Sequence, residues 1–129
     1  MKFSQDPQSL YSIRKVARDA IVVGESTFRS SLTILHDRLL ENWPDRPLAD
    51  IDMAYLEPLL AHSPELLILG SGWINVLPPR ELLFGLARKG IGLEVMDTPA
   101  ACRTFNILLA EDRRPAAILY LGKHDESPD

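Results

Sequence analysis

The stretch GLEVMDTPAACRTFN, residues 92–106, joins a strand pattern to a helix pattern and is the most informative segment for the class of fold. Residues 92–96 predict a short β-strand. Thr98 and Pro99 then follow as a typical N-cap and first helical residue. Four apolar residues at helical spacing make up the expected buried face of the helix: Ala101, Phe105, Leu108 and Leu109. We therefore expect a strand that leads directly into an amphipathic helix.

The same alternation extends on both sides of this stretch. Residues 66–69 (LLIL) form an apolar run that ends at Gly70, which is typical of a strand buried on both faces. Residues 116–121 predict a third strand. Strands that alternate with helices need crossover connections, so the sheet should be at least partly parallel. Pro79 predicts the start of a helix between the first two strands, with an apolar stripe of Leu82, Leu83, Leu86 and Ala87.

The residues before position 66 predict one more helix, preceded by several strands. Asp52 is a suitable N-cap for a helix that Pro58 would keep short or kinked. Short turns favour antiparallel pairing of the strands upstream. The overall prediction is an α/β fold, in which a mixed, partly parallel sheet carries an N-terminal antiparallel β-meander and about three helices. Within residues 10–43 we expect turns at 18–19, 24–25 and 36–37, one strand over 27–34, and a short strand ending near Trp43.

Length and composition favour one domain. The chain has 129 residues, of which 46% are hydrophobic and 25% charged, as in an ordinary globular protein. We expect a single domain over residues 10–121, with flexible tails at residues 1–9 and 122–129. The longest apolar run is too short to span a membrane, and residues 2–9 contain no signal-peptide core. The sequence therefore predicts a soluble, cytoplasmic protein.

The charge of the chain is unevenly distributed. The net charge of −4 argues against a nucleic-acid partner, because binding to phosphates needs clustered positive charge. Residues 37–65 contain seven acidic residues against two arginines, and they form either a solvated connection or a surface for a basic partner. Residues 66–123 carry more bases than acids, so this half is more suited to contact with an anion or an acidic partner.

Two loops that follow predicted strands carry candidate binding residues. In an open α/β sheet, the carboxyl ends of neighbouring parallel strands meet at one edge, and the helix N-termini there offer free N–H groups. This edge is a candidate site for a small anion or for a carboxylate of a partner. The alternative is structural, with Thr98 capping its helix and Asp97 completing the turn. The candidates are Gly70, Ser71, Gly72, Asp97 and Thr98.

The helix that follows contributes three further candidates, Cys102, Arg103 and Asn106. Cys102 lies within reach of the helix dipole, so the alternatives are a stabilised thiolate and a buried, unreactive thiol. Asn106 is polar within an apolar helix and should either bind backbone groups of a neighbouring loop or face a ligand. The histidines show no metal-ligand spacing and no catalytic motif is visible. No metal or cofactor is therefore expected, and no residue is assigned a catalytic role.

Residues 92–106 also carry a pattern that is specific in combination: Met96, Thr98, Ala101, Thr104 and Asn106. The run LLILGSG at residues 66–72 and the pair Pro78–Pro79 accompany it. In these features the chain resembles the Mth-nine-three-eight-like domain family, also called domain of unknown function four-nine-eight, over nearly all of residues 10–121. The resemblance implies a compact three-layer fold around a mixed sheet. It also implies similarity to the mitochondrial factor that helps to assemble respiratory complex I, and it carries over no catalytic residues.

Two functions of different classes follow from these observations. The first is a non-catalytic protein-interaction or assembly factor, related by resemblance to a respiratory complex, which binds a protein partner and can associate peripherally with a membrane through that partner. The second is a protein that binds a small molecule or an anion, or an unrecognised enzyme, which uses the strand ends near Gly70, Gly72, Asp97 and Thr98.

Overall fold

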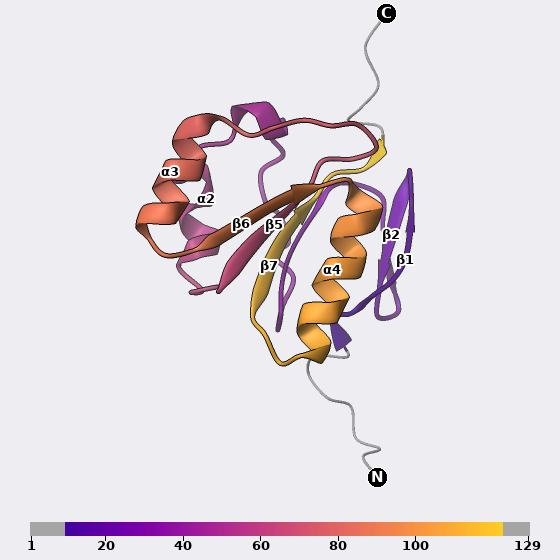
Figure 1. Ribbon diagram of the computed structural model, residues 1–129. Coiled ribbons are helices and arrows are strands. Elements are labelled where there is room, and N and C mark those ends of the chain that lie inside the picture. The colour runs from indigo at the N-terminus through magenta and orange to yellow at the C-terminus, as the bar shows by residue number, and fades with distance from the viewer. Residues whose placement is uncertain (1–9, 123–129) are drawn as a thin grey trace, which may run out of the picture.

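The computed structural model describes residues 10–122 and shows two sheets and their helices (Figure 1). The expected tail at residues 1–9 and most of the tail at residues 122–129 lie outside the described residues. Gly122 lies inside them and is buried, and its N–H donates to the carbonyl of Arg18 at 2.7 Å. Gly122 therefore belongs to the folded part of the chain.

The predicted N-terminal meander is confirmed. Strands β1 (Ile13–Ala17), β2 (Ala20–Val23) and β3 (Ser26–Phe28) pair antiparallel in the order β1-β2-β3. The expected turns at residues 18–19 and 24–25 connect them. Gly24 has φ +59°, a backbone conformation that glycine adopts without steric cost.

The single strand expected over residues 27–34 is wrong. The chain leaves the meander after Phe28 and enters a second sheet as β4 (Leu32–Leu35). All four residues of β4 are buried, including Thr33, so this strand lies between two layers and has no solvent face. Alternation of polar and apolar residues does not reveal such a change of sheet. The short strand expected up to Trp43 is reduced to one bridge between Ile34 and Leu39.

The predicted mixed sheet is confirmed as well. It contains β4, β5 (Leu66–Gly70), β6 (Gly92–Met96) and β7 (Pro115–Leu119), in the order β4-β7-β5-β6. Strand β5 pairs parallel with both β6 and β7, whereas β4 pairs antiparallel with β7. Every residue of β5 is buried, as the apolar run predicted.

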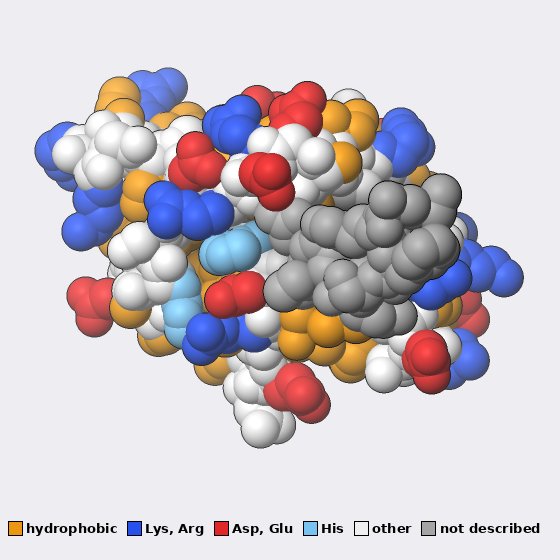
Figure 2. Space-filling view, turned by 90° about the horizontal axis from the view of Figure 1, so that it is seen from below, with side chains coloured by type: hydrophobic (Ala, Val, Ile, Leu, Met, Phe, Trp, Pro, Cys, Tyr) orange, Lys and Arg blue, Asp and Glu red, His pale blue; other side chains and the backbone are white. Residues whose placement is uncertain are grey.

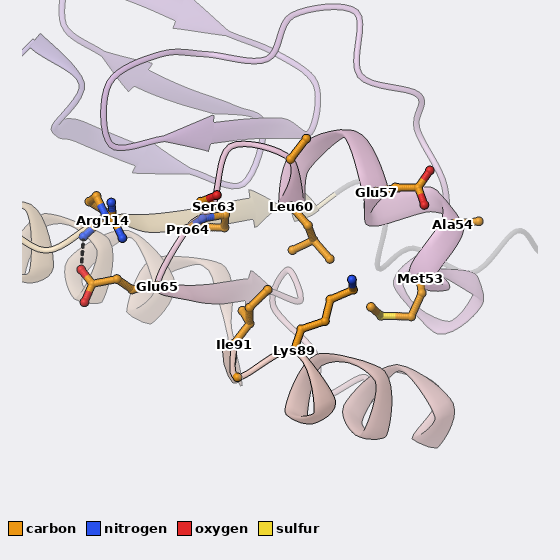
Figure 3. Close-up of a pocket in the computed structure, with 12 residues that line it drawn as sticks. Met53, Ala54, Glu57, Leu60, Ser63, Pro64, Glu65, Lys89, Ile91 and Arg114 are labelled. Carbon is orange, nitrogen blue, oxygen red and sulfur yellow. Dashed lines mark hydrogen bonds between the residues drawn. The ribbon is translucent and has the colours of Figure 1, made fainter.

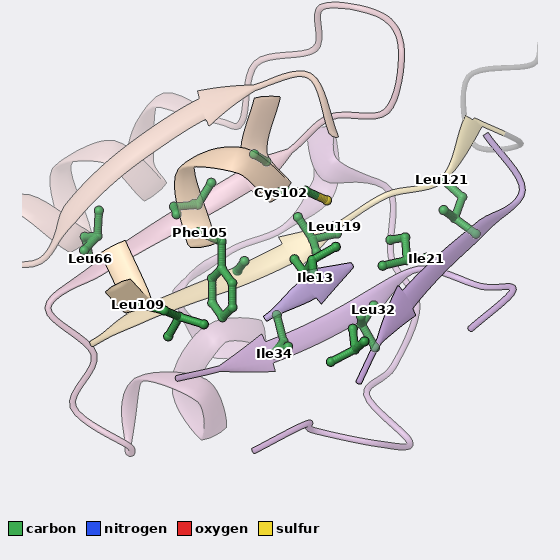
Figure 4. Close-up of a cluster of buried hydrophobic side chains, with 14 residues drawn as sticks. Ile13, Ile21, Leu32, Ile34, Leu66, Cys102, Phe105, Leu109, Leu119 and Leu121 are labelled. Atoms are coloured by element: carbon green, nitrogen blue, oxygen red, sulfur yellow. The ribbon is translucent and has the colours of Figure 1, made fainter. Parts of the chain in front are cut away.

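Helices cover both faces of this sheet and produce the three layers. Besides a short 3-10 helix, η1 (Leu48–Asp50), the helices are α2 (Met53–Leu60), α3 (Arg80–Arg88) and α4 (Thr98–Ala110). One hydrophobic cluster joins α2 and α3 to the sheet. A second cluster joins α4 and the meander to the opposite face, with Phe105 at its centre (Figure 4). No helix in residues 10–122 is both long and apolar enough to cross a membrane.

The apolar stripe expected for α3 is wrong at two positions. Leu82 and Leu86 are buried, but Leu83 is 44% exposed and Ala87 also faces solvent. The reason lies at Gly85, where an added Cβ would be 2.7 Å from Cγ and Sδ of Met53 on α2. Helix α3 therefore turns its glycine toward α2, which removes Leu83 and Ala87 from the interface.

Candidate functional site

The loops after β5 and β6 meet at one edge of the sheet, as the sequence predicted, but hydrogen bonds within the protein fill this edge. The hydroxyl of Thr98 donates to the carbonyl of Tyr120 at 2.6 Å and accepts the N–H of Gly72 at 2.8 Å. The hydroxyl of Ser71 donates to the carbonyl of Ile74 at 2.8 Å. Thr98 is completely buried. The structure thus brings Ser71, Gly72 and Thr98 together, and their polar groups form hydrogen bonds within the protein.

Gly70 serves close packing at the same place. A Cβ at Gly70 would lie 3.0 Å from Cβ of Ala101 and 3.0 Å from Oγ1 of Thr98. Any larger residue at position 70 would therefore push α4 away from β5. This contact accounts for a glycine at the strand end without a ligand.

The N-cap of α4 is Asp97, and the expectation that Thr98 caps the helix is wrong. The carboxylate of Asp97 accepts the N–H of Ala100 at 2.8 Å, and Thr98 is the first helical residue. Both residue types are good caps, but the hydroxyl of Thr98 has turned inward to Gly72 and Tyr120. Asp97 is exposed, so it remains on the surface at the edge of the filled region.

The other three candidates lie elsewhere, in a groove between β1 and α4. Cys102, Arg103 and Asn106 line this groove together with Pro99 and residues 13–16, around a cavity of about 230 Å³. The eight residues predicted from the sequence therefore fall into two groups: a filled strand edge and an open groove. Cys102 and its neighbour Ile13 also border the core (Figure 4).

Asn106 holds β1 against α4. Its Oδ1 accepts the N–H of Ile13 and its Nδ2 donates to the carbonyl of Ile13, each at 2.8 Å. The side chain thus satisfies both backbone groups of one strand residue, as a neighbouring strand would. This confirms the expectation that Asn106 binds backbone, although the partner belongs to a strand and not to a loop.

The surroundings of Cys102 disfavour a reactive thiolate. The residue is 3% exposed. Burial raises the pKa of the thiol to about 12, and the positive charge of Arg103 lowers the pKa only partly. Because the thiolate is the nucleophile, the thiol of Cys102 stays unreactive near neutral pH.

A larger cavity, which the sequence did not predict, lies between α2 and α3 near the start of β5 and β6 (Figure 3). Its volume is about 810 Å³, and Met53, Leu60 and Ile91 supply apolar surface. Glu57 and Lys89 add one charge of each sign. The cavity is formed at the amino ends of the parallel strands, whereas the binding site predicted from the sequence lies at their carboxyl ends. The sequence did carry one signal for this cavity, because two predicted helices each end a few residues before a predicted strand begins.

Glu65 at the rim of this cavity connects β5 to the turn before β7. Its carboxylate accepts the backbone N–H of Arg114 at 2.8 Å, and the guanidinium of Arg113 lies 3.4 Å away. The backbone hydrogen bond from Arg114, followed by the charge of Arg113, lowers the pKa of Glu65. A charged Glu65 is therefore favoured in the folded state.

The acidic segment 37–65 is partly neutralised by neighbouring arginines. Ion pairs join Arg38 to Asp37, Arg46 to Asp52 and Arg113 to Glu65. From below, acidic and basic side chains are interspersed on the surface (Figure 2). These features support the solvated connection over a continuous acidic surface.

Comparison with known proteins gives a family match over most of the chain. The family described as "Protein of unknown function (DUF498/DUF598)" matches residues 13–120. This match confirms the resemblance that residues 92–106 indicated.

Two curated proteins and one solved structure illustrate the similarity. A "13 kDa major membrane protein" of Francisella tularensis is 32% identical over 72 residues, which cover 56% of this chain and 58% of that protein. The "NADH dehydrogenase [ubiquinone] 1 alpha subcomplex assembly factor 3" of Danio rerio is 46% identical over 61 residues, or 47% of this chain and 35% of that protein. The chain thus matches less than two thirds of either relative. A solved Xanthomonas campestris protein has a TM-score of 0.82 and 32% identity, and the match covers 100% of this chain and 98% of that one.

Proposed function

We propose that this chain, which belongs to the DUF498/DUF598 family, is a non-catalytic assembly factor that acts by binding another protein. The observation that carries this proposal is the 46% identity to assembly factor 3 of Danio rerio, over 61 residues. The filled strand edge supports it, because the hydroxyl of Thr98 is buried and already bonded to the N–H of Gly72, so this hydroxyl is not available to a substrate.

The finer proposal is that the client is a respiratory NADH dehydrogenase. It rests on the printed name of the Danio rerio relative, of which the match covers 35%. The cytoplasmic location expected from the sequence remains a prediction, with contact to a membrane made through the client.

Deletion of the gene tests this role in a host that has a respiratory NADH dehydrogenase. Native gels should then show less assembled enzyme and accumulation of partly assembled subunits, and the wild-type chain should restore the enzyme. The Thr27→Val variant should restore it equally, because Thr27 is an exposed residue of β3 outside the candidate sites. Normal assembly in the deletion strain would refute the respiratory role.

Ligand binding at Gly70, Gly72, Asp97 and Thr98 is the less favoured alternative, because internal bonds occupy this edge. A thermal-shift screen with anionic metabolites separates the two functions, since any ligand that binds the folded state raises the melting temperature. We expect no shift. A clear shift, with changes in amide NMR signals at residues 70–72 and 97–98, would favour the alternative.

A further inference from the structure

The groove between β1 and α4 is rimmed by positive charge. Arg14 and Lys15 from β1 and Arg103 from α4 line it, all three are exposed, and no acidic residue among residues 10–122 lines it. None of the three bases forms an ion pair with another residue in the described part of the chain. Their charges are therefore available to a partner.

A strand irregularity places two consecutive bases along this groove. Side chains alternate between the faces of a regular strand, so neighbours such as Arg14 and Lys15 would point in opposite directions. The pairing of β1 with β2 shifts between Ile13 and Lys15, which leaves Arg14 as the extra residue. Such a bulge redirects a side chain, and both bases now line the same groove.

The groove has the size and rigidity of a pocket for side chains of a partner. Its volume of about 230 Å³ lies below the roughly 300–1,000 Å³ typical of small-molecule pockets. The two hydrogen bonds between Asn106 and Ile13 fix one wall against the other. Ile13 and Cys102 supply apolar surface at the bottom.

We infer that this groove binds an acidic segment of a partner protein, with its carboxylates on Arg14, Lys15 and Arg103. The inference rests on the proposed function and names the chemistry of the partner. Charge complementarity carries it, since three unpaired bases face an opening without acids. A nucleic acid is less suited, because the whole chain has a net charge of −4 and the basic rim is short.

Fluorescence anisotropy with a labelled synthetic peptide that alternates Glu and Val tests the inference. The full chain should bind this peptide, and added salt should weaken binding. The double variant Arg14→Glu/Arg103→Glu should bind about tenfold more weakly or worse, because charge reversal replaces attraction with repulsion. The matched control, Arg80→Glu/Arg88→Glu on α3, changes the net charge equally on exposed residues outside the groove and should bind as the wild type does.

Amide NMR spectra show whether each variant is folded and where the peptide binds. Shift changes in the wild type should concentrate in residues 13–16 and 99–106. Several outcomes would overturn the inference: no binding to the wild type, equal loss in both double variants, or shifts centred elsewhere. Equal binding of a Lys–Val peptide or of a single-stranded oligonucleotide would do the same. Binding that appears only after residues 123–129 are removed would assign the groove to the acidic end of the chain itself.

The deletion strain separates this inference from the proposed function. If the wild type restores assembly and the Arg14→Glu/Arg103→Glu variant does not, both stand. If the double variant restores assembly fully, the groove is not the docking site, whereas the assembly role survives. If the deletion itself has no effect on assembly, the respiratory role fails, and the peptide measurements still decide the chemistry of the groove.

Discussion

Thr98 closes the strand edge because its one hydroxyl serves two buried backbone groups, the N–H of Gly72 and the carbonyl of Tyr120. Replacement by valine keeps the shape but leaves both groups unsatisfied. We expect Thr98→Val to lower the free energy of unfolding by about 1–3 kcal/mol for each unsatisfied group. Urea denaturation measures the loss. The control Thr27→Val, on an exposed residue of β3, should change stability little. Equal effects would mean that the two bonds do not hold this edge closed.

Asn106 makes a second residue-scale prediction, because its side chain alone bonds both backbone groups of Ile13. In Asn106→Ala, hydrogen exchange at the amide of Ile13 should accelerate, while amides in the middle of α4 stay protected. Stability should fall by about 1–3 kcal/mol. Asn75→Ala, in an exposed loop, is the control. Unchanged exchange at Ile13 would contradict the role assigned to Asn106.

Single-residue roles were only partly predictable. The sequence indicated that Asn106 would bind backbone, because a polar side chain in an apolar helix needs a partner. It assigned the cap to Thr98 when Asp97 performs it. Both are good cap residues, and the choice depends on Gly72 and Tyr120, which are 26 and 22 positions away in the chain. Local preference does not contain that information.

At the scale of elements, the packing of α2 on α3 depends on Gly85. Alanine in place of glycine within a helix normally stabilises by about 0.5–1 kcal/mol. Here its Cβ would be 2.7 Å from Cγ and Sδ of Met53, so the flexible side chain of Met53 must shift toward the adjoining cavity, and Gly85→Ala should gain less stability than this. In the Met53→Ala background the same substitution should give the full gain. Thermal unfolding of the four proteins gives both values, and equal gains in the two backgrounds would contradict the close contact.

Glu65, just before β5, contacts the turn before β7, and its contribution to the stability of the protein should depend on pH. The N–H of Arg114 and the charge of Arg113 lower the pKa of Glu65 in the folded state. The contribution of Glu65 to the free energy of unfolding is therefore fully present above the pKa of the unfolded state. It disappears as the pH falls through the pKa of the folded state. The Glu65→Gln variant should therefore be less stable than the wild type at neutral pH and equally stable in strong acid. Urea denaturation at both pH values tests this, with Glu94→Gln as control. A difference that persists in acid would contradict the assignment.

Strands and helices with strong apolar patterns were predictable. The point at which the chain passes from the first sheet to the second was not. The apolar run at residues 66–69 predicted β5, because burial dictates apolar residues there, and the alternating pattern at residues 92–96 predicted the partly exposed β6. The division of residues 27–34 between β3 and β4 escaped prediction. Thr33 is polar yet buried, so β4 does not show the continuous apolar run of a fully buried strand.

For the whole molecule, the sequence predicted the class of fold but not which residues form an open surface. The groove combines residues 13–16 with residues 99–106, and only the folding of the meander onto α4 brings them together (Figure 1). The cavity between α2 and α3 depends in the same way on how two helices end beside two strands. Features made from distant segments carry no local signal in one sequence.

An assembly factor of this kind acts by binding another protein. Affinity capture of the tagged chain from its native cells, with quantitative mass spectrometry, is the decisive test. We expect one partner in near-stoichiometric amount that survives stringent washing. Enrichment of no protein above the tag-only control, even after mild crosslinking, would mean that the protein does not act in this way.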